Sequence, residues 1–401
     1  MTLLHDPPRG QLREARPRGP RRQRPLRIAM VGQRGLPATY GGIERHVEEV
    51  GRRLAERGHE VTVFCRAHYA PDARRTYEGM RLRAVPTIAS KHLDAVVHSV
   101  LCTLVAAVGR YDVVHYHGVG PGLASVALRL LGAGRRGPRV VLTVHGLDGE
   151  RAKWGGFAST LLRLATWASA RVPHATVGVS AELGRHYADT YGRDVTVIVN
   201  GATPARDVAP GTFLARHGLE PGHYALFVGR LVPEKAPDLL IEAFGDVPTD
   251  WHLVLAGDSS FTDGFAERVR GLAAADPRVV LPGYVYGDDL HELYGGAGLF
   301  VLPSELEGLP LTLLEAVAAG VPVLASDIAP HLEILRRDAP GGRLFPTGDR
   351  VALTAALRRL VREAGAERAG APGMRADVVA RFRWDTAAEQ LEALYRSLLR
   401  G

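Results

Sequence analysis

The stretch PSELEGLPLTLLEA, residues 303–316, joins the end of a short apolar run to the start of a helix. The run itself, LFVLPS at 299–304, predicts a buried strand. Pro310 suits the first helical position, where its missing N–H costs nothing, and Gly320 suits the residue that follows the last turn. A buried strand that leads directly into a helix is the repeating unit of a doubly wound α/β domain.

Two glutamates flank this helix start. Glu307 lies in the loop before the helix and Glu315 in its second turn, the latter roughly 8 Å along the axis from Pro310. The exposed main-chain N–H groups of 308–312 favour an anion, while carboxylates accept hydrogen bonds from sugar hydroxyls. A nucleotide sugar, with hydroxyls at both ends and a diphosphate between them, could contact both acids. Taken alone, the spacing also fits a capped surface helix with two solvated acids.

Strand and helix patterns alternate through the rest of the chain. Apolar runs in the N-terminal half, separated by helical patterns, predict strands at 26–32, 59–65, 111–118, 139–146 and 175–180. The pattern restarts after the Pro-, Ala- and Gly-rich stretch 200–210, with strands predicted at 223–230, 251–258, 278–285, 299–304 and 321–326. We therefore predict an α/β fold of two doubly wound, Rossmann-like domains that face each other across a cleft, where such sheets bind ligands.

The composition is that of a globular protein kept in a reducing compartment. The chain has 401 residues, more than one hydrophobic core usually organises. Its two cysteines, Cys65 and Cys102, form no disulfide pattern. The longest apolar run, 95–108, is interrupted by His98 and is too short to span a bilayer. No apolar segment of a signal peptide follows the basic start, so we expect a cytoplasmic protein.

Much of the net charge of +7 comes from the first 27 residues. The segment 7–27 carries eight arginines and one glutamate and has no apolar period, so we expect residues 1–26 to form a disordered Arg/Pro-rich tail. The tail is a solvated extension, sequence upstream of the true start, or a segment attracted to anionic lipid. In the last case each basic residue near the surface would strengthen the attraction by about 1 kcal/mol. Without a recognition motif, we expect no nucleic acid partner.

Several motifs in order carry a resemblance to a known family. PSELEGLPLTLLEAVAAGVPVLAS (303–326) resembles the donor-binding signature of retaining glycosyltransferases of family 4, which have the GT-B fold. FVGRLVPEKAPDLLIEAF (227–244) resembles their diphosphate motif, and RVVLPGYV (278–285) resembles the turn that contacts the nucleobase. Four further stretches resemble the bacterial branch that builds exopolysaccharide and other cell-surface glycans: VGQRGLPATYGGIERHVEEVGRRLAERGHEVTVFCR (31–66), SKHLDAVVHS (90–99), VVHYHGVGPGL (113–123) and TVHGLDGERAKWG (143–155).

The resemblance implies roles for particular residues. Glu307 would hold hydroxyls of the transferred sugar, and Glu315 would hold those of the ribose. Arg230 and Lys235 would bind the diphosphate, and His145 would face the sugar ring near C6 from the opposite domain. His145, Arg230, Lys235 and Glu307 are therefore the catalytic candidates. The other donor-binding candidates are Gly42, whose N–H would bind the distal phosphate, Tyr284 and Val285 beside the base, and Gly308, Leu309 and Pro310 at the helix start.

Plainer interpretations of these residues stay open. The two cationic side chains could be solvated charges at a strand end, and His145 could be a packed histidine. The glycines at 41–42 could simply make a turn before a helix. His115 and His117 are left between structural and functional roles.

The residue types agree with glycosyl transfer. The diphosphate leaves with growing negative charge, which two cations and helix-start amides would stabilise. The sequence contains no Asp-x-Asp pair to hold a divalent ion beside it, so we expect no metal and no cofactor other than the nucleotide-diphosphate sugar as co-substrate. No carboxylate is an obvious nucleophile. For the retaining outcome, the resemblance implies front-face attack, with the leaving phosphate taking the acceptor's proton.

The resemblance thus implies a retaining hexosyltransferase with an acceptor domain at 27–204, a donor domain at 205–380 and a final helix at 381–401 that packs back toward the N-terminal domain. It would transfer a sugar to a glycan or lipid-linked acceptor in cell-surface polysaccharide biosynthesis. Two alternatives stay open: another GT-B enzyme, such as a nucleotide-sugar epimerase, or a catalytically silent scaffold that binds sugar nucleotides. The segment 90–110 could make a peripheral contact with an anionic membrane, or form a buried helix under the first sheet.

Overall fold

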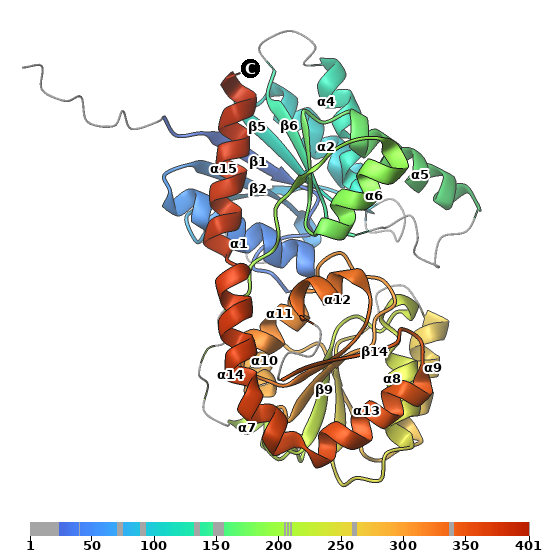
Figure 1. Ribbon diagram of the computed structural model, residues 1–401. Helices are drawn as coiled ribbons and strands as arrows, with labels where there is room; N and C mark the ends of the chain where they lie inside the picture. Colours follow the sequence, from blue (N-terminus) through green and yellow to red (C-terminus); the bar gives the residue numbers. More distant parts are fainter. Residues whose placement is uncertain are drawn as a thin grey trace, which may run out of the picture.

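Two β-sheets, each flanked by helices, organise the protein (Figure 1). The computed structural model describes residues 24–39, 41–69, 75–88, 94–131, 137–146, 156–203, 206, 208, 211–258, 263–336 and 341–400. The predicted disordered tail lies outside these segments except for 24–26, as does part of the predicted linker 200–210. None of the helices in the described segments combines the length and the apolar character that crossing a bilayer requires.

The first sheet has eight strands in the order β3-β4-β2-β1-β5-β6-β7-β8. The strands are β1 (Arg27–Val31), β2 (Glu60–Arg66), β3 (Thr76–Tyr77), β4 (Met80–Val85), β5 (Val113–His117), β6 (Arg139–Val144), β7 (Ala175–Gly178) and β8 (Thr196–Val197). All neighbours are parallel except β3 and β4. The six strands from β4 to β7 have the order of a dinucleotide-binding sheet.

Helices cover both sides of this sheet. They are α1 (Gly42–Glu56), α2 (Asp94–Val108), α3 (Val119–Gly122), α4 (Ser125–Leu131), α5 (Gly156–Arg171) and α6 (Ala181–Tyr191), with a short 3₁₀ turn η1 (Ala67–Tyr69). The helix α1 lies on one side, and α2, α4 and α5 lie on the other (Figure 1).

The second sheet has six parallel strands in the order β11-β10-β9-β12-β13-β14. The strands are β9 (Tyr224–Val228), β10 (His252–Ala256), β11 (Val279–Gly283), β12 (Leu299–Leu302), β13 (Val323–Ser326) and β14 (Gly342–Phe345). This order matches that of the six strands from β4 to β7 in the first sheet. The structure therefore confirms the predicted pair of Rossmann-like domains.

The second domain and the end of the chain supply the remaining helices. They are α7 (Thr212–Arg216), α8 (Pro237–Gly245), α9 (Asp263–Ala274), α10 (Gly287–Gly296), α11 (Leu311–Ala318), α12 (Ala329–Ile334), α13 (Arg350–Arg362), α14 (Ala364–Arg381) and α15 (Trp384–Arg400), with a 3₁₀ turn η3 (Pro233–Lys235). In the second domain, α8, α9 and α13 pack on one side of the sheet and α11 and α14 on the other (Figure 1).

Each sheet reverses its strand order at one point, and loops at such points bind ligands in doubly wound folds. The reversal lies between β1 and β5 in the first sheet and between β9 and β12 in the second. The loop after β1 passes very close to the end of β5. Gly32 in this loop has φ +120°, and a Cβ built on it would lie 2.4 Å from the carbonyl oxygen of His117. Only glycine fits there.

The last helix crosses from the second domain to the first and packs on α1 (Figure 1). Ion pairs join the two helices, with Arg53 Nε 2.9 Å from Asp385 Oδ1 and Arg57 Nε 2.7 Å from Glu392 Oε2. The hydroxyl of Tyr395, which is fully buried, lies 2.6 Å from Nδ1 of His115 under the first sheet. The C-terminal helix is thus part of the N-terminal domain's core.

One local expectation needs correction. Pro310 is the residue that caps α11 rather than its first helical residue, since its backbone is extended (φ −73°, ψ 110°) and α11 begins at Leu311. Gly320, with φ +76°, follows the helix as expected. Cys65 and Cys102 are both buried and free, which agrees with the absence of a predicted disulfide.

The helix α2 buries its polar side and exposes its apolar side. The buried residues are His98, Ser99, Cys102, Thr103 and Ala106. The exposed residues, at 46–87% of their full surface, are Val96, Val100, Leu104 and Val108. Hydrogen bonds such as Thr103 Oγ1 to Tyr116 Oη, at 2.8 Å, satisfy the buried side. One interpretation of 90–110 expected a fully buried helix, and this is wrong for α2. The helix is amphipathic, but its apolar side faces outward and its polar side faces the domain.

Candidate active site between the two domains

Glu307 is fixed by two neighbours in the loop that follows β12. Lys235, in the turn η3 after β9, forms an ion pair with Oε1 of Glu307. The hydroxyl of buried Ser304 donates a hydrogen bond of 2.8 Å to the same oxygen. Because β9 and β12 are neighbours at the point where strand order reverses, the fold brings residues 72 positions apart into contact.

The charge of Glu307 is decided by competing effects. Burial alone would raise the pKa of this carboxyl group, because a buried carboxylate loses its hydration. The charge of Lys235 and the hydrogen bonds from Lys235 and Ser304 lower the pKa by more, so that the net shift is downward. Glu307 is therefore an ionised acceptor at neutral pH, as holding sugar hydroxyls requires.

Glu315, in α11, lies in a different environment. Its Oε2 accepts a hydrogen bond of 3.1 Å from the hydroxyl of Tyr294, and its Oε1 lies 3.9 Å from Nε of Arg45. Burial raises the pKa of Glu315, with Arg45 and Tyr294 opposing the shift. Since Arg45 belongs to α1, this ion pair crosses from one domain to the other.

Arg230 and Lys235 belong to one loop between β9 and α8. Nη2 of Arg230 lies 3.7 Å from Oε1 of Glu234, and the arginine side chain is 30% exposed. Lys235 is more enclosed, at 14% exposed. The two predicted diphosphate ligands therefore follow the central strand of the second sheet, at its carboxyl end.

Two helix N-termini face each other at the domain boundary. Gly42 is the first residue of α1 and has no side-chain cap on its helix, and a Cβ built on it would lie 3.6 Å from Cδ1 of Leu311, the first residue of α11. The N–H groups of a helix start attract anions. Gly42 is thus placed next to the start of α11, which directly follows the loop residues Gly308, Leu309 and Pro310.

Gly308 lies against the main chain of the other domain. A Cβ built on Gly308 would be 1.9 Å from the carbonyl oxygen of His145 and 3.2 Å from Cα of Gly146. A side chain cannot occupy that space without moving the backbone. Gly308 therefore permits the contact that brings His145 next to the loop of Glu307.

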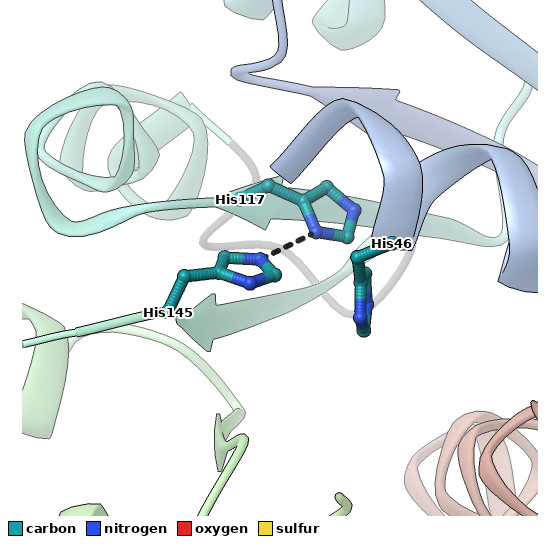
Figure 2. A group of neighbouring side chains, drawn as sticks. All are labelled: His46, His117 and His145. Atoms are coloured by element: carbon teal, nitrogen blue, oxygen red, sulfur yellow. Dashed lines mark hydrogen bonds between the residues drawn. The ribbon is translucent and has the colours of Figure 1, made fainter. Parts of the chain in front are cut away.

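Three histidines converge beside this contact (Figure 2). His46 comes from α1, His117 ends β5, and His145 follows β6. Their ring centroids are 4.7 Å apart for His46 and His145, 5.4 Å for His46 and His117, and 5.6 Å for His117 and His145. His46 and His117 are buried, and Nδ1 of His46 donates to Oδ1 of Asn200 at 2.8 Å.

Burial is the main influence on these rings. It lowers the pKa of His46 to about 4, against the opposing effect of the Asn200 hydrogen bond. The pKa values of His117 and His145 are also lowered well below the usual value, by burial and by the neighbouring histidines. His115 is bonded at both nitrogens, to Tyr395 and to Thr143, which favours a structural role for this residue.

Tyr284 and Val285, expected beside the base, lie in the loop between β11 and α10. Tyr284 is 38% exposed and stacks on Tyr286, with ring centroids 5.9 Å apart and planes inclined by 13°. Val285 packs against the core. The loop thus presents two aromatic faces at the carboxyl edge of the second sheet, where a base could stack.

The structure brings four of the sequence-selected residues into two contacts, Lys235 with Glu307 and Gly308 with His145, and places Gly42 beside Leu311 at the domain boundary. Five further residues of the site were not predicted from the sequence: Arg45, His46, Asn200, Tyr294 and Ser304. Arg45 and His46 follow Gly42 by three and four residues, so helical spacing places them in the turns next to the helix start. Asn200 follows a strand of the first sheet, where functional side chains of doubly wound folds collect.

Comparison with known proteins places the chain in a family. Residues 40–206 match the profile "Glycosyltransferase Family 4", and residues 214–372 match "Glycosyl transferases group 1". The D-inositol 3-phosphate glycosyltransferase of Acidothermus cellulolyticus is 30% identical over 94% of this chain and 91% of its own. The chain belongs to glycosyltransferase family 4. An alpha-maltose-1-phosphate synthase of Mycobacterium tuberculosis is 29% identical over 93% of this glycosyltransferase and all of its own length.

Solved structures of low sequence identity share the fold of this glycosyltransferase. Sucrose-phosphate synthase from Thermosynechococcus elongatus superposes with a TM-score of 0.77 at 23% identity, covering 93% of this chain and 99% of the other. Anabaena HepE in complex with UDP-glucose superposes with a TM-score of 0.77 at 18% identity, covering 93% of this chain and 100% of the HepE chain. These similarities confirm the predicted GT-B architecture. The predicted exopolysaccharide branch stays a prediction, since the relatives named above have other acceptors in their names.

Proposed function

We propose that this glycosyltransferase transfers a hexose, with retention of configuration, from a nucleotide-diphosphate sugar to a glycan or lipid-linked acceptor of a cell-surface polysaccharide. The Lys235–Glu307 pair carries the proposal, because it sets a cation and an ionised acceptor side by side at the domain boundary. The nucleotide sugar is supported by the bound UDP-glucose of Anabaena HepE and by the motif resemblance.

The cations and helix starts would act on the leaving group. In this proposal Arg230, Lys235 and the N–H groups at Gly42 and Gly308 would stabilise the diphosphate as it gains charge. Donors already aimed at a developing charge need no reorganisation during the reaction. We therefore propose transfer without a metal ion at the diphosphate, since the sequence offers no Asp-x-Asp pair for one.

Retention would follow from attack on the same face as the leaving phosphate. Glu307 is held at Oε1 by a cation and a hydroxyl, an arrangement suited to binding hydroxyls through Oε2 rather than to attacking a sugar carbon. The leaving phosphate itself would then take the acceptor's proton. His145 would contact the sugar ring from the N-terminal domain.

An apolar face of the N-terminal domain supports a membrane-side acceptor. Its exposed residues are Val96, Val100, Leu104 and Val108 of α2, Leu130 of α4, and Leu164 and Trp167 of α5. Asp94 is the only acidic residue in these three helices, whereas Arg129, Arg163 and Arg171 are basic. An apolar face with basic residues suits the surface of an anionic membrane, so we propose peripheral contact there.

The test combines binding and product analysis. Isothermal titration with UDP, GDP and ADP identifies the base. Incubation of the full chain with the matching nucleotide sugars and a lipid-linked acceptor should then release nucleoside diphosphate, and proton NMR should show the donor's anomeric configuration in the product. An inverted product would reject retention. Nucleotide binding without donor turnover would favour a silent scaffold, and an epimerised nucleotide sugar would favour an epimerase.

A further inference from the structure

We propose that His46, His117 and His145 form a binding site for a divalent transition-metal ion of the zinc class. One ring nitrogen of each residue lies within 4.8 Å of the corresponding nitrogens of the other two. Figure 2 shows the three rings converging from α1 and from the ends of β5 and β6. Zinc is often held by three imidazoles, with a fourth position left for water or an oxygen of a substrate.

The spacing of the nitrogens fits shared coordination. Two imidazole nitrogens that bind a tetrahedral zinc ion at about 2 Å lie roughly 3.4 Å from each other. Nδ1 of His117 and Nε2 of His145 are 3.4 Å apart, which is long for a hydrogen bond between nitrogens. A side-chain movement of roughly 1–2 Å would bring the nitrogen of His46 to the same spacing.

An unsatisfied nitrogen is the second, independent observation. Nε2 of His46 makes no hydrogen bond within the part of the chain that the structure describes, although the residue is only 1% exposed. An unsatisfied buried polar group costs about 1–3 kcal/mol. A bound ion would use the lone pair of His46 Nε2 and remove that cost.

Asn200 supplies the support that metal-binding histidines usually have. It accepts a hydrogen bond from Nδ1 of His46 at 2.8 Å, which fixes the proton on Nδ1 and leaves the lone pair on Nε2. Metal-bound histidines typically donate their other N–H to an oxygen in this way. Trp384 packs edge-on against His46, with ring centroids 5.8 Å apart.

This site is separate from the diphosphate loop, since its ligands all belong to the N-terminal domain. An ion there would engage His145, which the proposed function assigns to the donor sugar. We therefore expect the ion to inhibit transfer rather than to assist it. The inhibitory part rests on the proposed function, whereas binding of the ion does not.

Binding is tested on the untagged full chain after removal of metals with EDTA and gel filtration. Titration with Zn²⁺ by calorimetry should show one tight site, and Co²⁺ should give the intense visible absorption of a tetrahedral complex. His46→Gln should abolish the Co²⁺ spectrum, and Asn200→Ala should weaken Zn²⁺ binding by about 10- to 100-fold. His186→Gln, on α6, is the matched control and should bind like the wild type.

Equal Zn²⁺ binding and equal Co²⁺ spectra in the wild type, His46→Gln and Asn200→Ala would overturn the proposal, as would the absence of tight binding by the wild type. Circular dichroism checks the fold of each variant. If His46→Gln does not fold, His145→Gln, which is partly exposed, replaces it. Zn²⁺ binding by a chain without transferase activity would reject the proposed function and leave the metal site standing.

Discussion

Gly308 shows how one residue can control the meeting of two domains. The space that its Cβ would fill is occupied by the carbonyl oxygen of His145, 1.9 Å away. Any side chain at this position must push the loop of Glu307 away from the N-terminal domain. Because displacements of about 1 Å can lower catalytic rates by about a hundredfold, this contact is a sensitive point of the proposed site.

We predict that Gly308→Ala lowers kcat/KM by about a hundredfold. Steady-state kinetics with the nucleotide sugar identified by titration provide the measurement. Gly271→Ala is the control, because a Cβ at Gly271 in α9 would meet no atom within 4 Å. Wild-type kcat/KM in Gly308→Ala would show that the two domains need not meet here for catalysis.

Lys235 has two effects that one substitution can separate. It would stabilise the leaving diphosphate, and it lowers the pKa of Glu307 against the effect of burial. We predict that Lys235→Ala lowers kcat by about a hundredfold at saturating donor. The variant should also lose activity at a higher pH than the wild type as pH falls, because Glu307 without its cation takes a proton more readily.

The measurement is kcat from pH 5 to 8, expressed as a ratio to the wild type. Arg216→Ala is the control, since Arg216 is a 60% exposed cation of the same domain whose ion pair is with Asp289, away from Glu307. Unchanged turnover in Lys235→Ala would contradict the electrostatic role. If the variant is slower but its pH profile has the same shape as that of the wild type, the predicted effect on the pKa of Glu307 is wrong, whereas the electrostatic role of Lys235 stands.

At the scale of elements, the contact between α1 and α15 depends on Glu392. Its carboxylate accepts hydrogen bonds from Arg57 at 2.7 Å and Arg396 at 2.8 Å, and it lies 3.3 Å from Nε2 of His59. Burial raises the pKa of Glu392, but the two arginines lower it by more, so that the resulting pKa is about 2. A carboxyl group with a lowered pKa stabilises the folded state above its unfolded pKa and loses this effect as pH falls through the folded value.

We predict that Glu392→Gln lowers stability by about 1–2 kcal/mol at pH 7. The difference from the wild type should shrink as pH falls from about 4.5, the ordinary value, toward about 2, where the wild-type carboxylate is protonated. Thermal unfolding at several pH values measures this. Glu389→Gln, at an exposed position on the same helix, should have little effect, and a pH-independent difference for Glu392→Gln would contradict the prediction.

The positions of strands, helices and loop residues could be predicted from the sequence better than which side of a helix is buried. Glu307 and Lys235 could be selected because each follows an apolar strand within a recognisable motif. The orientation of α2 could not be predicted, because the apolarity of 95–108 is nearly continuous and gives no clear periodicity. The buried side becomes visible only in the fold, where Thr103 hydrogen-bonds to Tyr116 of β5.

The histidine cluster could not be predicted for a different reason. His46 and its partner Asn200 are 154 residues apart, and their contact depends on how the whole first sheet is ordered. Neither residue belongs to a motif with metal-ligand spacing. Such a cluster becomes visible only when β5, β6 and α1 are placed side by side.

At the scale of the whole molecule, the domains are joined by more than their linker. Glu333 of α12 accepts hydrogen bonds from the main-chain N–H of Ala181, at 2.9 and 3.2 Å, at the start of α6. The helix α15 returns to the first domain and packs on α1. The side of the first domain away from α1 and α15, where α2, α4 and α5 lie (Figure 1), therefore stays outside these contacts.

This side offers the apolar face proposed to meet a membrane. Arg171 lies over the ring of Trp167, 5.0 Å from its centroid, and such aromatic–basic pairs suit the boundary between lipid and water. In parallel α/β folds a helix that follows a strand starts near the strand's carboxyl end. The starts of α2 and α5 consequently lie toward the same edge of the sheet as His117 and His145, which is the edge at which the proposed membrane-side acceptor would arrive.

We predict that the full chain floats with anionic liposomes and not with neutral ones, and that binding falls with salt because exposed charges are screened beyond roughly 8–10 Å at physiological ionic strength. The double variant Val100→Asn/Leu104→Asn should lose about tenfold in binding, since it removes two apolar side chains from the contact. Val351→Asn is the matched control, because Val351 is 80% exposed on α13 of the other domain. A chain that begins at Pro25 separates the tail from the face. Loss of binding by this chain, with binding kept by the full-length double variant, would assign the contact to the tail. No flotation by the wild type would leave a soluble acceptor as the better interpretation.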